Sequence, residues 1–134
     1  MQIIEGIGID LVRIDRIKLV FDNYGERFLR RVFSDEEILN MNDIIISNKK
    51  RALQKIAGYF AAKEAFLKSA GCGLFSIPFD RIRIFNAPSG MPFFKFDENL
   101  KNLLVKKYKK TYSRIHLSIT HENGLAIAFV VLER

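Results

Sequence analysis

The sequence predicts an α+β domain, and three observations support that prediction. The apolar patterns along the 134 residues follow the order strand, three helices, two strands, helix and two strands, which is not the strict alternation of a parallel α/β fold. Short turn sequences separate the members of two strand pairs, as expected for antiparallel hairpins. One helical pattern, at residues 50–70, is much longer than the others. We therefore expect the helices to lie apart from a mainly antiparallel sheet.

The amino-terminal elements begin with a strand. Residues 2–10, QIIEGIGID, are apolar and β-branched and carry two glycines near their end. Apolar residues at helical spacing predict a helix over 12–24, with Gly25 as its stop. The sequence SDEE at 34–37 matches a capping box, which predicts the start of another helix. Residues 42–50 are the least regular part of the chain, and we expect a loop or a frayed helix end there.

The carboxyl-terminal elements follow the long helix, which is predicted to end at Gly71. Each has a local pattern: alternating apolar residues for strands, turn residues between them, and an N-capping aspartate for the last helix. They are a strand at 79–85, a turn at 87–92, a return strand at 93–96, a helix after Asp97, and two strands at 114–121 and 125–133 joined by a hairpin turn.

Composition limits the class of protein. Hydrophobic residues make up 49% and charged residues 28%, so the chain can build a core. No apolar run approaches the roughly 20 residues of a membrane helix, and the amino terminus lacks the pattern of a secretory signal. Cys72 is the only cysteine, which excludes an intrachain disulfide and a cysteine-rich zinc site. These features predict a cytoplasmic protein with no membrane partner.

The net charge of +7, from 22 Lys+Arg against 15 Asp+Glu, predicts an anionic partner. Excess positive charge raises the rate of encounter with such a partner and makes that rate sensitive to salt. Nucleic acid, an acidic protein and a phosphorylated small molecule all fit this charge.

Glu64 occupies a position where the long helix should present apolar side chains. With Leu53 as the origin of a helical projection, the apolar residues of this helix fall within an arc of roughly 140°. Glu64 projects at about 20°, inside that arc, and Lys68 projects about 40° further round. A buried carboxylate is costly unless it is protonated, paired with a cation or bound to a metal ion. An i,i+4 ion pair with Lys68 at the edge of the core is the simpler explanation.

A second carboxylate offers a functional explanation. Asp10 follows Gly6 and Gly8 at the end of the first predicted strand, where glycine lets another backbone or a ligand approach closely. Taken singly, Asp10 is most often a helix N-cap, and GIG is a fragment of a phosphate-binding glycine pattern. Two carboxylates together suit Mg²⁺, which binds one or two carboxylates, several waters and a substrate phosphate. Both explanations of Glu64 stay open at this point.

Two histidines and a cysteine are further candidates. His121 shares the parity of the apolar positions in the strand 114–121, so it points to the apolar side, either as a hydrogen-bonded hairpin residue or as a site residue. His116 has the opposite parity and is predicted to lie on the surface. Cys72 stands between two glycines and is interpreted as a small residue at the helix exit, with a nucleophile as the less favoured hypothesis.

Several segments together match one family. They are GIGIDLVRIDRI near the amino terminus, FLRRVFSDEE (28–37), AGYFAAKEAFLKSAG (57–71), PSGMP (88–92) and LSITHENGLAIAFVVLE (117–133). Over nearly its whole length the chain resembles the holo-acyl-carrier-protein synthases, the short bacterial type of phosphopantetheinyl transferase. The resemblance implies a single domain, 1–134, with the phosphopantetheinyl transferase fold: one long central helix packed on a small, mainly antiparallel sheet. It also implies a homotrimer with sites between neighbouring subunits.

The resemblance implies a reaction and the residues that perform it. Enzymes of this family transfer 4'-phosphopantetheine from coenzyme A to a serine of apo acyl carrier protein, release adenosine 3',5'-bisphosphate, and support fatty acid biosynthesis. The resemblance implies that Asp10 and Glu64 hold Mg²⁺ on the pyrophosphate. Glu64, directly or through a metal-bound water, is our choice of general base. The residues expected near coenzyme A are Lys63, Lys68, Gly71, Gly73 and His121, of which Lys68 and His121 are also expected to be catalytic.

A basic surface is predicted to bind the acidic carrier protein. Its residues match the docking surface of the family in type and position, with a phenylalanine as apolar anchor. Each charge taken singly can also be an ordinary solvated side chain. The predicted docking residues are Arg13, Arg16, Arg27, Phe28 and Arg31.

Tyr59 departs from the family pattern, which commonly has a basic residue at this position to hold coenzyme A near its adenosine end. Tyrosine can stack or form a hydrogen bond, but it cannot match the charge of a phosphate. Lys50, Arg51 or Lys55, earlier on the same helix, can compensate for the missing charge.

A basic nucleic-acid-binding module is the alternative function. The segment KKYKKTYSR (106–114) interleaves lysines with Tyr108 and Tyr112, which could follow phosphates and stack on bases. A solvated helix face is the simpler explanation of that segment, and the alternative leaves Asp10 and Glu64 unexplained. An enzymatically silent scaffold with the same fold would also give the acid pair no role. We therefore expect no nucleic-acid partner.

Overall fold

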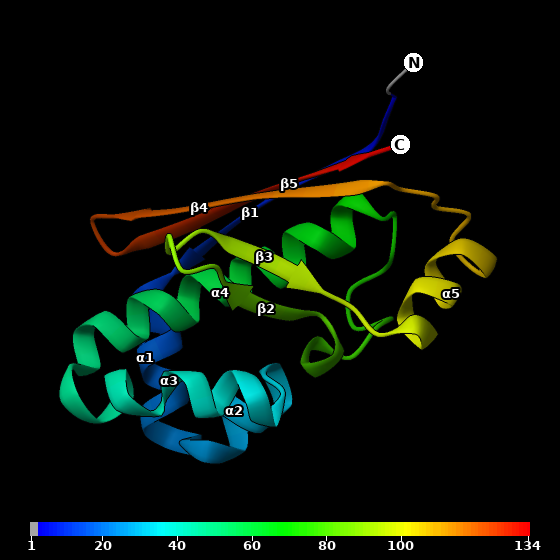
Figure 1. The fold of residues 1–134 in the computed structure, drawn as a ribbon. Helices are drawn as coiled ribbons and strands as arrows, with labels where there is room; N and C mark the ends of the chain where they lie inside the picture. Colours follow the sequence, from blue (N-terminus) through cyan, green and yellow to red (C-terminus); the bar gives the residue numbers. More distant parts are fainter. Residues whose placement is uncertain (1–2) are drawn as a thin grey trace.

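The computed structural model describes residues 3–134 (Figure 1). Its helices are α1 (Ile14–Tyr24), α2 (Glu26–Val32), α3 (Asp35–Ser47), α4 (Lys49–Ser69), the 3₁₀ turn η1 (Phe79–Arg81) and α5 (Glu98–Lys106). Its strands are β1 (Ile4–Arg13), β2 (Arg83–Asn86), β3 (Pro92–Lys95), β4 (Arg114–Glu122) and β5 (Leu125–Glu133). Within this described part of the chain, none of the helices has both the length and the apolar character needed to span a membrane. The predicted α+β class is confirmed.

Three strands form an antiparallel sheet in the order β1-β5-β4, and β2 and β3 form a separate hairpin. Because β5 is central, Asp10 of β1 pairs with Ala128, and His121 of β4 pairs with Ala126. α4 runs along one face of this sheet, and α1, α2 and α3 lie on the other side of α4 (Figure 1). The long helix is therefore central, as the family resemblance implied.

β1 lies directly on the backbone of α4. A Cβ built on Gly6 would be 1.8 Å from the carbonyl oxygen of Ser69, and one built on Gly8 would be 1.8 Å from that of Ala65. No side chain fits at either position, so the two glycines are required for the contact. The GIG sequence therefore serves a helix–strand approach within the protein.

α3 begins as predicted but ends later. The capping box is confirmed: the N–H of Glu37 donates to Oγ of Ser34 at 3.3 Å, and the N–H of Ser34 donates to Oε1 of Glu37 at 2.9 Å. The helix then continues to Ser47, so the expected loop or frayed end at 42–50 is wrong. Asn48 separates the two helices and caps α4 by accepting a hydrogen bond from the N–H of Arg51 at 3.1 Å.

Two other boundaries differ from the prediction. β1 continues to Arg13, so Asp10 lies within the strand and not at its end. The predicted strand 2–10 also began at a residue outside the described part of the chain. The short helix α2 was not predicted, and it raises the number of α-helices between the first and second strands from three to four.

The carboxyl-terminal half follows the prediction more closely. Asp97 caps α5, because its Oδ1 accepts a hydrogen bond from the N–H of Leu100 at 2.8 Å. The two final strands form the predicted hairpin. The predicted strand at 79–85 is shorter than expected, since its first three residues form η1 and β2 begins at Arg83.

The face of the sheet turned away from α4 is apolar and exposed. Side chains alternate along a strand, so the residues between the two glycines and Asp10 point away from the helix. The exposed fractions are 60% at Ile7, 57% at Ile9, 57% at Leu11 and 43% at Phe129, which pairs with Ile9.

Candidate active site

Two carboxylates meet where β1 crosses α4. Asp10 has the same strand parity as the glycines that touch the helix, and Glu64 precedes Ala65, whose carbonyl oxygen faces Gly8. The side chain of Asp10 is close enough to that of Glu64 to raise the pKa of Glu64. The structure therefore brings together the two acids that the sequence analysis had paired.

Lys68 joins this group from the next turn of α4. Its Nζ donates to Oδ1 of Asp10 at 3.2 Å and to the carbonyl oxygen of Ile9 at 2.9 Å. The side chain of Lys68 is 57% exposed and that of Asp10 only 11%, so the ammonium group reaches from the surface to a largely buried carboxylate. The simpler explanation, an ion pair between Glu64 and Lys68, is therefore wrong, because the lysine pairs with Asp10.

The carboxylate of Glu64 lies in an unfavourable electrostatic environment. Burial raises its pKa, and the adjacent carboxylate of Asp10 raises it further, to about 7. The positive charges of Lys68 and Arg16 oppose this rise without cancelling it. Two close carboxylates with too little positive charge around them favour a bound proton or a bound cation.

Mg²⁺ fits this pair of acids. Oδ2 of Asp10 is buried and has no hydrogen-bond partner in the structure, although a buried carboxylate oxygen normally has one. Mg²⁺ binds proteins through one or two carboxylates and fills its other positions with water and substrate phosphate. Between residues 3 and 134 no group of three or more His, Cys, Asp and Glu side chains is placed to form a closed metal site. An open Mg²⁺ site formed by two carboxylates does not need a third protein ligand.

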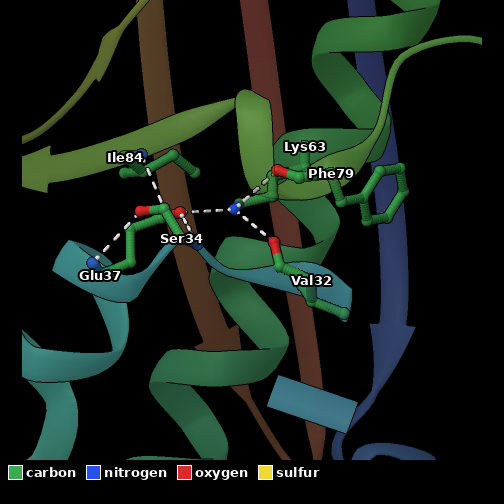
Figure 2. A network of polar contacts seen from close by, with 6 residues as sticks. All are labelled: Val32, Ser34, Glu37, Lys63, Phe79 and Ile84. Carbon is green, nitrogen blue, oxygen red and sulfur yellow. Dashed lines mark hydrogen bonds and ion pairs between the residues drawn. The ribbon is translucent and has the colours of Figure 1, made fainter. Parts of the chain in front are cut away.

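Lys63 does not point toward the acid pair. Its side chain is completely buried, and its Nζ donates to Oε1 of Glu37 at 2.9 Å and to the carbonyl oxygens of Val32 at 2.6 Å and Phe79 at 3.0 Å (Figure 2). An ammonium group has three protons, and all three are used in these bonds. The expectation that Lys63 contacts a phosphate is therefore wrong for this structure.

A cavity of about 610 Å³ forms the second part of the predicted site. It lies between the first half of α4, the β2–β3 hairpin and the end of β4. Its polar lining includes Arg51, Lys55, Tyr59, Asn86 and His121. Neither acid of the pair lines it, so within one chain His121 and the carboxylates occupy separate places.

Tyr59 is fixed in the wall of this cavity. Its hydroxyl donates to Oδ1 of Asn86, and Nδ2 of Asn86 donates to the carbonyl oxygen of Gly90 at 2.9 Å. Burial raises the pKa of Tyr59 to about 12; the hydrogen bond to Asn86 acts in the opposite direction, and the negative charge of Glu37 adds to the rise. The tyrosine therefore ties α4 to the turn of the hairpin as a neutral group.

Two cations stand beside Tyr59 in the cavity. Nζ of Lys55 lies 5.5 Å from the centroid of the Tyr59 ring, and burial together with the charge of Arg51 lowers the pKa of Lys55. Lys50 lines a different cavity, near Lys18. Three residues were expected to compensate for the basic residue that the family commonly has at the position of Tyr59. Of these, Arg51 and Lys55 line the same cavity as His121.

The exit of α4 is a tight turn. Gly71 has a φ of 70°, a left-handed conformation that favours glycine, and a Cβ on Gly73 would meet no atom within 4 Å. Cys72 between them is buried, and burial raises the pKa of its thiol. A nucleophilic cysteine needs a lowered pKa, so the interpretation of Cys72 as a structural residue is favoured.

Part of the predicted docking surface forms a groove. The groove has a volume of about 310 Å³ and is lined by Val20 and Tyr24 of α1 and Arg27, Phe28 and Arg31 of α2. Both arginines are exposed, and Phe28 is half-buried. We name this surface the docking groove.

The remaining arginines near the docking groove have other surroundings. Arg30 pairs with Glu26 at 3.0 Å and with Asp35 at 3.4 Å, so its charge is largely compensated. Arg13 and Arg16 are exposed and lie outside the groove. The positive charge of Arg16 lowers the pKa of Glu64, so this residue lies near the acid pair.

Sequence reasoning missed two polar residues of this region. Glu37 was predicted as a capping-box residue, and the same carboxylate also binds Lys63 and the N–H of Ile84. Asn86 was not singled out, although it holds Tyr59. Both residues act through partners distant in sequence, and no local pattern marks such contacts.

Comparison with known proteins identifies the family to which the chain is similar. The family model of the 4'-phosphopantetheinyl transferase superfamily matches residues 6–130. A holo-[acyl-carrier-protein] synthase of Halothermothrix orenii is 41% identical over 130 residues, which are 97% of this chain and 98% of that protein.

Solved structures show the same fold. The crystal structure of a holo-[acyl-carrier-protein] synthase from Neisseria meningitidis superposes with a TM-score of 0.83 and 33% identity, covering 98% of this chain and 100% of that one. The Helicobacter pylori holo-[acyl-carrier-protein] synthase, solved in complex with coenzyme A, gives a TM-score of 0.76 and 31% identity over 94% and 98% of the two chains. The chain therefore belongs to the 4'-phosphopantetheinyl transferase superfamily.

Proposed function

We propose that this protein is a Mg²⁺-dependent holo-[acyl-carrier-protein] synthase. It transfers 4'-phosphopantetheine from coenzyme A to a serine of apo acyl carrier protein and releases adenosine 3',5'-bisphosphate. The observation that carries the proposal is the meeting of Asp10 and Glu64 beside Lys68, in a chain of this superfamily. The relative of known structure that is solved with coenzyme A supports the choice of substrate.

Asp10 and Glu64 are the residues that hold Mg²⁺. When bound there, the ion neutralises charge on the pyrophosphate of coenzyme A and improves the adenosine bisphosphate as a leaving group. The buried, unpartnered Oδ2 of Asp10 and the raised pKa of Glu64 both support a cation at this position. Lys68 already lies on Asp10 and brings a second positive charge to the transferred phosphoryl group.

The transfer forms a bond between the serine oxygen and phosphorus as the phosphorus–oxygen bond to the leaving phosphate breaks. The serine hydroxyl must lose its proton during this step. We assign Glu64 as the acceptor of this proton, directly or through water, because its carboxylate lies beside Asp10 at the proposed place of transfer. The chain thus supplies position, positive charge and a proton acceptor.

The cavity with His121 receives the nucleotide end of coenzyme A. Arg51, Lys55 and His121 supply positive charge or hydrogen bonds for its phosphates. Tyr59 contributes a fixed aromatic wall where other members of the family commonly carry a base. We propose that Gly71 and Gly73, at the exit of α4, lie beside coenzyme A.

The docking groove binds the acidic carrier protein. Arg27 and Arg31 flank Phe28, so two charges surround one apolar anchor. Arg13 and Arg16 extend the positive surface toward the acid pair. A net charge of +7 supports attraction of an acidic partner.

A homotrimer explains two features of the isolated chain. The apolar sheet face around Ile9 is left exposed, and such a patch is typical of a buried interface. The cavity with His121 is separate from the acid pair within one chain. In a trimer, the apolar face is buried between subunits. One subunit then supplies the carboxylates of a site, and a neighbouring copy supplies its cavity.

The alternative of a nucleic-acid-binding module gains no support. Tyr108 and Tyr112 of the basic segment are half-buried and pack against the core, so neither ring is a free stacking surface. Lys110 donates to the carbonyl oxygen of Glu5 at 3.1 Å. The proposed enzyme includes the whole chain, 1–134, as one domain and acts in the cytoplasm.

Mass spectrometry of a carrier protein tests the proposal. Apo acyl carrier protein is incubated with the enzyme, coenzyme A and Mg²⁺, and the expected product carries one phosphopantetheine group on serine. A reaction without Mg²⁺ and one with apo carrier protein whose serine is replaced by alanine are the controls. An unmodified carrier protein in the complete reaction would contradict the proposed function.

A further inference from the structure

A buried ion pair joins Glu37 of α3 to Lys63 of α4 (Figure 2). The two side chains are 1% and 0% exposed, and Nζ of Lys63 lies 2.9 Å from Oε1 of Glu37. The pair lines neither the cavity nor the docking groove. The proposed reaction uses neither side chain, so their burial and their complete set of partners call for another explanation.

Lys63 fixes the end of the helix that carries the docking groove. Its Nζ donates to the carbonyl oxygen of Val32 at 2.6 Å, and Val32 is the last residue of α2. The ring of Phe33, the next residue, lies with its centroid 4.6 Å from the same nitrogen. Lys63, which directly precedes Glu64 in α4, thus ties the carboxyl-terminal end of α2 to α4.

Glu37 fixes the hairpin that forms one wall of the cavity. Its Oε2 accepts a hydrogen bond from the N–H of Ile84 in β2 at 3.1 Å. Asn86, two residues further along the same strand, holds Tyr59 and lines the cavity. The carboxylate of Glu37 therefore connects α4, through Lys63, to the strand that positions the nucleotide end of the site.

Stability alone does not explain such a pair. Both charged groups are almost completely removed from water, and the attraction between two buried charges often fails to offset the cost of that removal. An apolar pair of the same size fills such a space at similar or better stability. An apolar pair has no directional contacts. Hydrogen bonds require a defined geometry, so they fix which backbone groups face the side chain.

We infer that Glu37 and Lys63 form a positioning pair, which holds the docking groove and the nucleotide cavity in register with the catalytic face of α4. The inference rests on the proposed function, since it assigns the groove to the carrier protein and the cavity to coenzyme A. Each member serves one side: Lys63 holds α2, and Glu37 holds β2. This division predicts a different kinetic effect for each substitution.

Lys63→Met tests the link to α2. Methionine keeps the length of the side chain and removes the hydrogen bonds to Glu37, Val32 and Phe79. The apparent KM for apo carrier protein is expected to rise by about tenfold, the scale of one lost directional contact. The KM for coenzyme A is expected to change much less.

Glu37→Gln tests the link to β2. The amide oxygen can still accept from Lys63, but the amide N–H₂ then faces the N–H of Ile84, and two donors repel each other. The expected result is the opposite split, with the KM for coenzyme A rising more than the KM for carrier protein. Amide hydrogen exchange of Ile84 gives a readout independent of activity, because its N–H is expected to lose protection.

Leu104→Ala on α5 is the matched control for lost stability. Leu104 is buried, so the variant lowers Tm, but the residue touches neither α2 nor β2 and should leave both KM values unchanged. Assays are run well below the Tm of every variant, and Glu37→Gln decides the matter if Lys63→Met does not fold. Wild-type KM values in Glu37→Gln, with Ile84 still protected, would overturn the inference. A wild-type chain that transfers nothing would instead overturn the proposed function.

Discussion

The properties of Asp10, Glu64 and Tyr59 come from their immediate surroundings. Asp10 carries a buried oxygen without a partner, and Glu64 has a pKa of about 7 because burial and Asp10 both disfavour its charge. Tyr59 is held neutral by burial and by the nearby negative charge of Glu37, which together raise its pKa.

Tyr59 is predicted to ionise near pH 12. Its pKa is raised from 10.0 in the folded state, so folding favours the protonated phenol. The resulting stabilisation is complete below the unfolded pKa of 10.0 and is lost as the pH rises through about 12. A spectrophotometric titration of tyrosinate in the wild type and in Tyr59→Phe isolates this group by difference. A difference curve centred near pH 10 would contradict the assignment.

The sequence predicted the position of Glu64 better than that of Lys63. The apolar arc of α4 correctly included Glu64. Lys63 projects about 20° beyond the edge of that arc, and the family resemblance placed it near coenzyme A. It is fully buried because helices and the hairpin cover the side of α4 that the sheet leaves free. A projection of one helix cannot show how many layers surround it.

At the scale of elements, the contact between β1 and α4 creates the acid pair. The two glycines remove the side chains that would separate strand and helix, and Asp10 then continues on the same face of the strand. The geometry of the site therefore depends on residues that take no part in chemistry.

Gly8→Ala is predicted to destabilise the fold by about 3 kcal/mol, because the new Cβ meets a backbone carbonyl that cannot move aside. That Cβ would lie 1.8 Å from the carbonyl oxygen of Ala65. Gly73→Ala is the matched control, since its Cβ has open space. Urea denaturation measures both variants. Equal midpoints for the two would show that β1 and α4 can separate without cost.

Element boundaries were predicted where a local signal exists. The capping box gave the start of α3, and Asp97 gave the start of α5. The end of α3 has no basic residue in its last turn and no glycine, so the sequence offered nothing to mark it. α2 has only seven residues and depends on packing against α1, η1 and α3, which local sequence does not reveal.

At the scale of the whole molecule, three of the surfaces formed by the described residues take part in the proposed function. They are the basic docking groove, the cavity that contains His121, and the apolar face of the sheet. The sequence predicted the first from clustered arginines. The sequence did not distinguish the apolar face of the sheet from the core, because Ile7, Ile9 and Leu11 have the apolar character of buried strand residues.

Arg31→Glu is predicted to raise the KM for carrier protein by about tenfold while leaving the KM for coenzyme A unchanged, because the groove loses attraction for an acidic partner. Lys106→Glu on α5 makes the same change in net charge away from the groove and is the control. Steady-state kinetics at two salt concentrations measure the effect. An equal rise in both variants would attribute it to total charge and not to the groove.

Ile9→Lys is predicted to convert a trimer into monomers and to abolish transfer, because a charge cannot be buried in an apolar interface without a partner. Light scattering after size exclusion measures the mass of the assembly. Ile46→Lys, at an 85% exposed position on α3, is the control. A monomeric and active wild type would show that one chain contains the complete site.

The Mg²⁺ dependence of transfer tests the central claim most directly. Initial rates are measured against Mg²⁺ concentration for the wild type, Asp10→Asn, Glu64→Gln and the exposed control Glu98→Gln. The account predicts that the control behaves as the wild type. Asp10→Asn should need far more Mg²⁺, and Glu64→Gln should lose on the order of 10²–10⁴ in rate at any concentration. A wild-type rate and Mg²⁺ requirement in both site variants would contradict the account.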